Sequence, residues 1–368
     1  MRRTFTSLLY GRRCVQSALL AAVTTTTTTT TTAASNITSP VSVALNTCMR
    51  LQGTRQGPPS GVPPELRAPV QGSRPQQPME NVGEGEEPAF EPPKKPEEPP
   101  KMLKIDTNDK GIVTIHLCRA PVNSLNLELL DEFNKWMYWL GSDESCRSVI
   151  ITSAIPTVFS AGLDILELRN PQPERLARFW HAFQETWLIL NTFPKPIVSA
   201  INGNSPAGGC IFALGSDARV MAAHPAGKPE RPYRIGLNEV KLGIPAPAWA
   251  IRAYAAVLGP RRAERMVQLG ETPTAAEAAS IGLVDLVVAE EGDVLAAATR
   301  EAERFLAVAQ PSRWMMRDIM RRELLEDIYS DEAREHETQF VVGLMMDAEV
   351  QRSLEAYVAR LKGMPAKK

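Results

Sequence analysis

A single glutamate in an apolar, glycine-flanked segment is the residue of this chain best suited to proton transfer. Glu239 lies in the segment 235–244, between Gly236 and Gly243. A carboxylate among apolar side chains is poorly solvated, so its pKa rises toward neutrality and it can act as a base near neutral pH. A surface glutamate paired with Lys241 is the other interpretation that the spacing allows. The segment therefore indicates a general base or an ordinary ion pair.

Two glycine turns, each preceded by a short apolar run, could supply hydrogen-bond donors to such a site. The segment 158–165 follows the run 149–153, and the segment 205–210 follows the run 197–201. Backbone N–H groups are left free where a helix begins, and they attract negative charge. Two such donors are what an oxyanion hole needs, although each turn alone could simply shape a tight corner. With a base nearby, they would support proton abstraction next to a carbonyl.

The residues and the order of these motifs resemble those of the crotonase (enoyl-CoA hydratase/isomerase) superfamily. The matching motifs are Phe159-Ser-Ala-Gly-Leu-Asp164, Ser205-Pro-Ala-Gly-Gly-Cys210 and Gly236-Leu-Asn-Glu239. Further segments resemble its mitochondrial 3,2-enoyl-CoA isomerase subgroup: Pro121-Val-Asn-Ser-Leu125, Arg262-Ala-Glu-Arg265 and Gln268-Leu-Gly270. The resemblance runs from about Leu103 to Lys362. It implies an α/β fold with a crotonase-type spiral core of ββα turns and a helical C-terminal region that mediates oligomerisation, expected to give a trimer.

The resemblance also implies roles for individual residues. The backbone N–H groups of Leu163 and Gly208 would form the oxyanion hole, and Glu239 would be the catalytic base. The substrate, an acyl-CoA thioester, would contact Ala161, Gly162, Leu163, Asp164, Ile165, Gly208 and Asn238. Coenzyme A would be part of the substrate, so neither a separate cofactor nor a metal is expected.

Position 211 discriminates between reactions within the superfamily. Its hydratases carry a second glutamate after the Gly-Gly-Cys turn, whereas this chain has Ile211. One carboxylate suits a proton shuttle better than the addition of water. The predicted activity is therefore the conversion of cis or trans 3-enoyl-CoA to 2-trans-enoyl-CoA in β-oxidation of unsaturated fatty acids. Another crotonase-type reaction (hydration or thioester hydrolysis) and a non-catalytic acyl-CoA-binding scaffold are the alternatives.

Several neighbouring residues invite a chemical role and also have a structural interpretation. Asp164 is expected to cap a helix. Cys210 is expected to be a small buried helix residue and not a nucleophile. Candidates for binding the coenzyme A phosphates, each also explicable as a solvated side chain, are Arg119, Arg317, Arg321 and Arg322. The loop His224–Pro232 looks longer than is usual in the isomerases, so it could widen or cover the acyl pocket.

The N-terminal quarter of the chain differs in composition from the rest. Residues 1–56 are rich in arginine and hydroxyl side chains and contain no Asp or Glu, which is typical of a mitochondrial transit peptide with a low-complexity segment. A secretory signal is the rival interpretation. Residues 57–101 are rich in Pro and Glu and read as a disordered linker, with a proline-rich docking site as the alternative. A mitochondrial matrix location follows from the first interpretation.

Composition excludes several other classes. A formal charge of −1 over 368 residues gives no support for a nucleic-acid partner. The five cysteines are scattered without Cys-x-x-Cys pairs, which argues against a disulfide framework or a zinc site. The apolar run 18–23 is too short for a transmembrane segment.

Strand and helix patterns alternate through a predicted spiral core, 102–246, and give way to a mostly helical region, 247–368. A hairpin is expected around Asn108–Gly111, and Asn126 is expected to cap a helix that reaches Leu140. Further strands are predicted at 149–152, 197–201, 219–222 and 283–288, and further helices at 174–190 and from Cys210 to Leu214. The apolar run of Val350, Leu354, Tyr357, Val358 and Leu361 could pack between subunits or within the chain.

Overall fold

The computed structural model describes residues 93–361 and residue 363. The predicted transit segment and most of the predicted linker therefore lie outside the described residues. Residues 93–101 form neither helix nor strand, but the backbone N–H groups of Lys101 and Met102 donate to the Glu132 carboxylate at 3.0 and 2.9 Å. The last residues of the predicted linker are thus held against the folded part.

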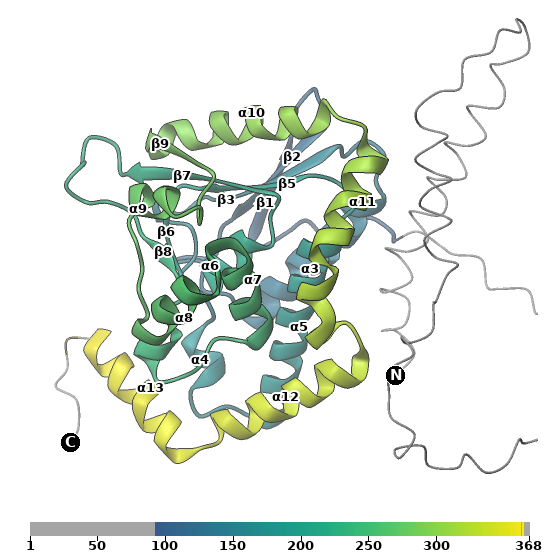
Figure 1. The fold of residues 1–368 in the computed structure, drawn as a ribbon. Helices are drawn as coiled ribbons and strands as arrows, with labels where there is room; N and C mark the ends of the chain where they lie inside the picture. Colours follow the sequence, from purple (N-terminus) through teal and green to yellow (C-terminus); the bar gives the residue numbers. More distant parts are fainter. Residues whose placement is uncertain (1–92, 362, 364–368) are drawn as a thin grey trace, which may run out of the picture. The chain divides into compact units, whose positions relative to one another are not determined.

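A six-stranded sheet forms the main layer (Figure 1), in the order β1-β2-β3-β5-β7-β9. Its strands are β1 (Leu103–Thr107), β2 (Ile112–Leu117), β3 (Ser148–Ser153), β5 (Ile197–Ile201), β7 (Ala218–His224) and β9 (Leu286–Glu290). β1 and β2 pair antiparallel as the predicted hairpin, and the other neighbours pair parallel. β3 and β5 are buried along their whole length, which explains why both read as continuous apolar runs.

A second, three-stranded parallel sheet lies beside the first and was not predicted. It contains β4 (Thr157–Val158), β6 (Gly203–Pro206) and β8 (Ile235–Gly236) in the order β4-β6-β8. Each of these short strands follows a strand of the main sheet along the chain, and a helical segment comes next. The repetition of strand, strand and helix is the expected ββα spiral.

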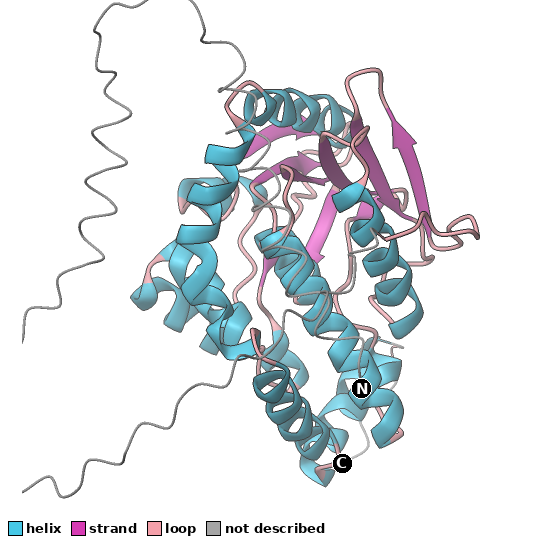
Figure 2. Ribbon diagram, turned by 90° about the vertical axis from the view of Figure 1, so that its right-hand side faces the viewer, coloured by secondary structure: helices cyan, strands magenta, loops and turns pink. Residues whose placement is uncertain are grey.

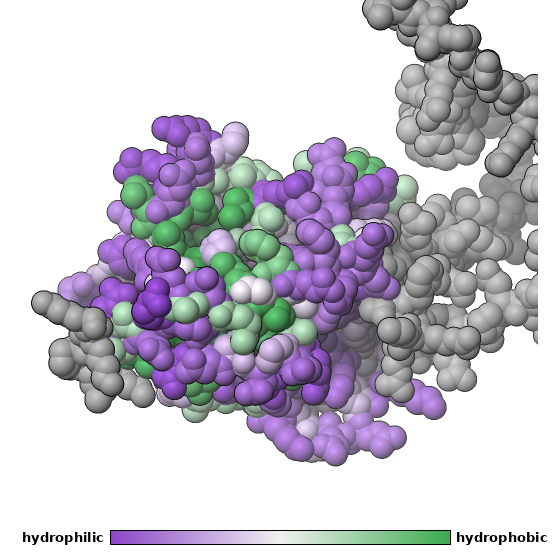
Figure 3. All heavy atoms as spheres, turned by 90° about the horizontal axis from the view of Figure 1, so that it is seen from below, coloured by the Kyte–Doolittle hydropathy of each residue, from purple (hydrophilic) through white to green (hydrophobic). Residues whose placement is uncertain are grey.

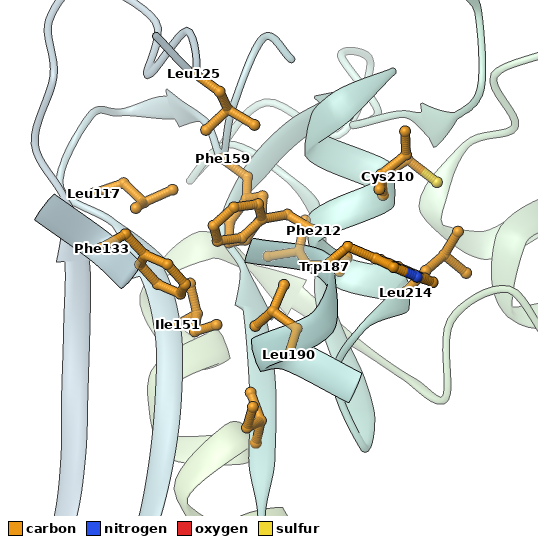
Figure 4. Packing of buried hydrophobic residues seen from close by; sticks show 14 of the residues in the cluster. Leu117, Leu125, Phe133, Ile151, Phe159, Trp187, Leu190, Cys210, Phe212 and Leu214 are labelled. Atoms are coloured by element: carbon orange, nitrogen blue, oxygen red, sulfur yellow. The ribbon is translucent and has the colours of Figure 1, made fainter. Parts of the chain in front are cut away.

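Helices cover both faces of the main sheet. On one face, α3 (Leu127–Ser142) packs against α5 (Pro173–Thr192), and α6 (Gly208–Leu214) completes the layer. α3 begins after Asn126, as predicted, because that side chain accepts a hydrogen bond from Leu129 N–H. Figure 4 shows how Phe133 of α3 meets Phe212 of α6, with ring centroids 4.8 Å apart. The buried core therefore joins helices that are far apart in the sequence.

Most of the remaining described chain is helical, and Figure 2 shows the helices in cyan around the magenta strands. Besides α3, α5 and α6, the helical segments are α4 (Ile165–Leu168), η2 (Glu239–Leu242), α7 (Ala248–Leu258), α8 (Pro260–Leu269), α9 (Ala275–Ser280), η3 (Glu291–Asp293), α10 (Val294–Leu306), α11 (Gln310–Arg321), η4 (Arg322–Ile328), α12 (Asp331–Met345) and α13 (Ala348–Leu361). β9 pairs with β7, and α10 packs on β3, β5 and β7. Part of the region after residue 246 therefore packs on the same sheet as the predicted spiral core. No described helix is long and apolar enough to cross a membrane.

A buried carboxylate anchors α11 to the core. Asp217, just before β7, faces three guanidinium groups of α11, at 2.6 Å from Arg317 and 3.7 Å from both Arg313 and Arg321. The side chains of Asp217 and Arg317 are each only 6% exposed. A buried charge is tolerable only with such partners, so this ion cluster fixes the helix to the end of the sheet.

We expect Asp217→Asn to lower the free energy of unfolding by about 3–5 kcal/mol, because it leaves buried guanidinium groups without their counter-charge. Urea titration of the purified protein measures this change. The matched control is Asp318→Asn, which removes a carboxylate whose pair with Arg322 is exposed. That control should change stability by less than about 1 kcal/mol. Equal effects of the two substitutions would contradict the anchoring role of Asp217.

Candidate active site

The three strands of the small sheet end at the same edge, and the predicted site residues follow directly after them in the chain. Thr157 of β4 pairs with Gly203 of β6, and Pro206 of β6 pairs with Gly236 of β8. Because all three strands run parallel, their carboxyl ends lie together. The chain leaves β4 into the loop 159–164, β6 into α6, and β8 into the turn that carries Glu239.

Most backbone N–H groups of the loop after β4 donate to other groups of the protein. Ala161 N–H donates to Val122 O at 2.9 Å, and Asp164 N–H donates to Leu125 O at 2.9 Å. Gly162 N–H donates to the Ser160 hydroxyl at 3.1 Å. No described residue accepts a hydrogen bond from Leu163 N–H. This amide is therefore available to a ligand.

The amide of Gly208 lies beside that of Leu163. Gly208 is the first residue of α6, so its N–H has no partner within the helix, and no other described residue accepts from it. A Cβ atom added to Gly208 would lie 3.0 Å from the Leu163 nitrogen and 3.2 Å from the Gly162 Cα. Glycine thus keeps open the space in front of the Leu163 amide, which is the cradle that an oxyanion needs.

Glu239 is the first residue of η2, and its buried carboxylate has no counter-ion among the residues that the structure describes. Its side chain is 7% exposed, and its Oε2 has no hydrogen-bond partner among the described residues. Burial raises the pKa of Glu239 from 4.5 to about 7. Its electrostatic neighbours include the buried thiol of Cys210 on α6 and the buried hydroxyl of Tyr254 on α7. No ion pair joins it to the exposed Lys241, so that interpretation of the sequence is wrong.

The other predicted substrate-binding residues differ in whether their side chains already have a hydrogen-bond partner and in how exposed they are. Asn238 precedes the base, and its Oδ1 is buried without a partner. The Asp164 carboxylate is already engaged, because it caps α4 through Leu166 N–H at 2.9 Å and pairs with Arg119 at 2.7 Å. Ala161 is exposed, and Ile165 is half-buried at the start of α4. The capping role predicted for Asp164 is therefore observed.

Two of the arginines considered for the coenzyme A phosphates are structural. Arg317 belongs to the Asp217 cluster, and Arg321 donates to Gly215 O and Ser216 O at 2.7 Å each. Arg119 donates to Ser124 O at 2.8 Å in addition to its pair with Asp164. Exposed Arg322, the first residue of η4, pairs with Asp318 of α11 at 2.6 Å.

Two further expectations concern residues close to the site. Burial raises the pKa of the Cys210 thiol well above its usual range, so the residue is a neutral core side chain, as predicted. In the long loop, Gly227 N–H donates to Glu290 at 3.0 Å and the His224 ring contacts Pro225 O at 2.9 Å. These described hydrogen bonds hold the loop near β9, and none reaches Glu239.

The loop 159–164, called the donor loop below because it carries the Leu163 amide, is braced by residues that the sequence analysis did not identify. Asn123 stands at a left-handed φ of 48° and donates to the Ser153 hydroxyl at 2.7 Å and to Phe159 O at 3.1 Å. The Ser160 hydroxyl donates to Asn123 O at 2.7 Å. The motif Pro121-Val-Asn-Ser-Leu125 carried the signal, but it gave no hint that Asn123 reaches across to the loop after β4.

Two free amides and a buried carboxylate of raised pKa are the groups that proton transfer next to a carbonyl requires. Residues 107–364 match the family model described as enoyl-CoA hydratase/isomerase. The chain is 42% identical over 263 residues to the mitochondrial enoyl-CoA delta isomerase 1 of Mus musculus, covering 71% of this chain and 88% of the relative. The Homo sapiens enzyme of that name is 39% identical over 252 residues, covering 68% of this chain and 80% of the relative.

Solved structures agree with these matches. The crystal structure of human mitochondrial delta3-delta2-enoyl-CoA isomerase superposes with a TM-score of 0.67 at 37% identity, covering 72% of this chain and 99% of that chain. A probable enoyl-CoA hydratase 2 of Arabidopsis thaliana is less similar, 28% identical over 194 residues, covering 52% of this chain and 62% of the relative. The chain belongs to the enoyl-CoA hydratase/isomerase family and has the crotonase fold.

The raised pKa of Glu239 predicts how activity depends on pH. A base must be ionised, so we expect kcat/KM to rise with pH, with a midpoint near the value of about 7. Initial rates between pH 5 and 9 provide the measurement. A profile that is flat from pH 5.5 upward would mean that Glu239 is either ordinary in pKa or not the base.

The same pKa makes a prediction for stability. The folded state binds this proton more tightly than the unfolded state, so the contribution is fully present below pH 4.5 and is lost as the pH rises through about 7. Glu239→Gln cannot ionise, so its gain over the wild type should be larger at pH 8 than at pH 5, by up to about 3 kcal/mol. Urea titrations at both pH values test this. Equal differences at the two pH values would contradict it.

Proposed function

We propose that this protein moves the double bond of a 3-enoyl-CoA, cis or trans, to give 2-trans-enoyl-CoA. The observation that carries this proposal is the buried Glu239, with a pKa of about 7, at the edge where the free amides of Leu163 and Gly208 lie. The relatives named as enoyl-CoA delta isomerases support it at 39–42% identity.

The reaction follows from these groups. The protons on carbon 2 of a 3-enoyl thioester are acidic, because they lie between the carbonyl and the double bond. Glu239 removes one of them, and the electron pair of the broken C–H bond delocalises into a dienolate with its charge on the thioester oxygen. The N–H groups of Leu163 and Gly208 stabilise that oxygen, each by about 3–4 kcal/mol in the transition state.

Return of the proton completes the isomerisation. The protonated Glu239 gives its proton to carbon 4, the carbonyl re-forms, and the double bond now joins carbons 2 and 3. No atom is gained or lost, and the carboxylate is regenerated. A pKa near 7 suits both steps, because the same group must act as base and then as acid. We infer that Ala161, Gly162, Asp164, Ile165 and Asn238 shape the walls around the thioester.

Position 211 separates this reaction from hydration. Ile211 lies one helical turn after Gly208 and is 2% exposed. A hydratase needs a second polar group to orient water, and an isoleucine at this place supplies none. The apolar surroundings that raise the pKa of Glu239 also disfavour a bound water.

We also propose the setting in which this activity operates. The relatives named mitochondrial, together with the acid-free, arginine-rich residues 1–56, support import into the mitochondrial matrix and a role in β-oxidation. Coenzyme A enters as part of the substrate, so no separate cofactor is required. A trimer is the assembly we expect. Figure 3 shows apolar side chains gathered between polar ones on the face seen from below, which is the kind of surface that subunit contacts cover.

The direct test incubates the purified protein separately with 3-hexenoyl-CoA and with 2-hexenoyl-CoA. We expect the first to be converted to 2-trans-hexenoyl-CoA, and the second to remain without hydration. Hydration of the second substrate would favour a hydratase, release of free coenzyme A would favour a thioesterase, and binding without turnover would favour a scaffold.

Glu239→Gln keeps the size of the side chain but removes the base. We expect turnover to fall at least about 10²-fold, the lower range for loss of a positioned base, while octanoyl-CoA still binds. Single-turnover rates and isothermal titration measure the two properties. If the variant kept more than about a tenth of the wild-type turnover, the base would lie elsewhere.

Ile211→Glu would place a second carboxylate one turn after the Gly208 donor. We expect isomerisation to fall and some hydration of 2-hexenoyl-CoA to appear, because two groups can then activate and orient water. The new carboxyl group is buried, so its pKa should rise and the fold should lose stability, which thermal unfolding would register. Ile211→Gln is the control of similar size without a titratable group. A folded glutamate variant with unchanged isomerase kinetics would show that position 211 does not border the site.

A further inference from the structure

The C-terminal helix α13 touches both segments that carry the proposed catalytic groups. The side-chain amide of Gln351, in the first turn of α13, forms hydrogen bonds with the end of α4 and the residues that follow it. Its Oε1 accepts from Asn170 N–H at 2.8 Å, and its Nε2 donates to Leu168 O at 2.9 Å and to Met345 O at 2.6 Å. One side chain thus ties α13 and the end of α12 to the end of α4.

α4 connects these contacts to the donor loop. It spans only Ile165–Leu168, and its N-cap is Asp164, the residue next to Leu163. At that end, Asp164 is held by Arg119 at 2.7 Å. At the other end, the chain turns through Asn170 at a left-handed φ of 47°, and Gln351 binds its N–H. A single turn of helix held at both ends leaves the Leu163 amide little freedom to move.

The same helix also reaches the turn that carries the base. Gly243 closes η2 by donating to Glu239 O and Val240 O, and its φ is 81°. A Cβ atom added to Gly243 would lie 2.6 Å from the Ser353 Cβ, so α13 packs directly on this turn. Leu354, the next residue of the helix, is fully buried. The apolar face of α13 therefore packs within the chain here.

We propose that α13 sets the position of the donor loop relative to the base, with Gln351 as the positioning residue for the Leu163 amide and Ser353 for the Glu239 turn. This inference rests on the proposed isomerase function. Neither side chain is proposed to touch the substrate. The helix therefore contacts both halves of the site.

The first arm of the experiment changes Gln351 in the full chain. Gln351→Met keeps the length of the side chain and loses all three hydrogen bonds. We expect kcat for 3-hexenoyl-CoA to fall about tenfold, because a displaced donor weakens the charged transition state more than the neutral ground state. KM should change less than twofold, and the pH midpoint of kcat/KM should stay in place. Gln351→Glu keeps the acceptor for Asn170 N–H and should recover part of kcat.

The second arm changes the other contact. Ser353→Leu would push against Gly243 and displace the turn that carries Glu239. We expect the pH midpoint of kcat/KM to fall by at least about half a unit, because a displaced carboxylate is better solvated and its pKa moves toward the ordinary value. The matched control for both arms is Gln339→Met on α12. The Gln339 side chain is exposed and bonds only to Glu335 of the same helix, so this variant should match the wild type.

Hydrogen exchange provides a readout that does not depend on activity. We expect faster exchange of the segment 160–170 in Gln351→Met and of the segment 239–243 in Ser353→Leu, with each variant sparing the other segment. The proposal would be overturned if Gln351→Met and Ser353→Leu both kept the kcat and the hydrogen-exchange rates of the wild type. It would also be overturned if Gln339→Met lost as much kcat as Gln351→Met. If the wild type itself fails to isomerise 3-hexenoyl-CoA, the proposed function fails, while the exchange measurements still decide whether α13 braces the two segments.

Discussion

Parallel pairing of three very short strands is the constraint on which the site depends. β4, β6 and β8 contain two, four and two residues, so they contribute little sheet of their own. Their register nevertheless brings together three chain segments that are separated by about 30 to 45 residues along the chain. A one-residue slip of β6 against β8 would move the amide of Gly208 by about 3.3 Å relative to the Glu239 turn. Backbone hydrogen bonds therefore set the geometry that the chemistry requires.

The main sheet and its helices supply the rigidity that such short strands lack. β3, β5 and β7 are covered by α10 on one side and by the layer of α3, α5 and α6 on the other. The chain passes from each of these strands into a strand of the small sheet, so the large core holds the small sheet in place. Asn123 then fixes the loop after β4 by donating to Phe159 O at 3.1 Å and by accepting from the Ser160 hydroxyl at 2.7 Å. The apolar core thus stabilises the site without contributing a reactive group to it.

Much of the main sheet and of the site could be predicted from the sequence, because their signals are local. Long apolar runs predicted β3 and β5, and Asn126 marked the start of α3 correctly. β6 consists of Gly, Asn, Ser and Pro, which have low strand propensity, and β8 has only two residues, so pairing with distant segments makes them strands. β9 starts three residues later than predicted, at Leu286, since its register with β7 fixes its limits.

The sequence patterns could not predict which side chains would be hydrogen-bond or ion-pair partners. Arg317 and Arg321 looked like candidates for phosphate binding because nothing in a helix of mixed charge reveals a buried aspartate 100 residues earlier. The raised pKa of Glu239 was predictable from its apolar segment, but the absence of a pair with Lys241 was not. The sequence motif identifies the base, and the three-dimensional arrangement decides its environment.

The burial of Glu239 links chemistry and specificity through one physical cause. Removing water from the carboxylate raises its pKa to about 7, which matches a group that must accept a proton and return it in the same turnover. The same removal of water leaves nothing to add across the double bond, and the buried Ile211 offers no group to hold a water. A more hydrated site would lower the pKa of Glu239, and it would also allow water to add across the double bond. The preference for isomerisation over hydration therefore rests on Ile211 together with the desolvation that makes Glu239 an effective base.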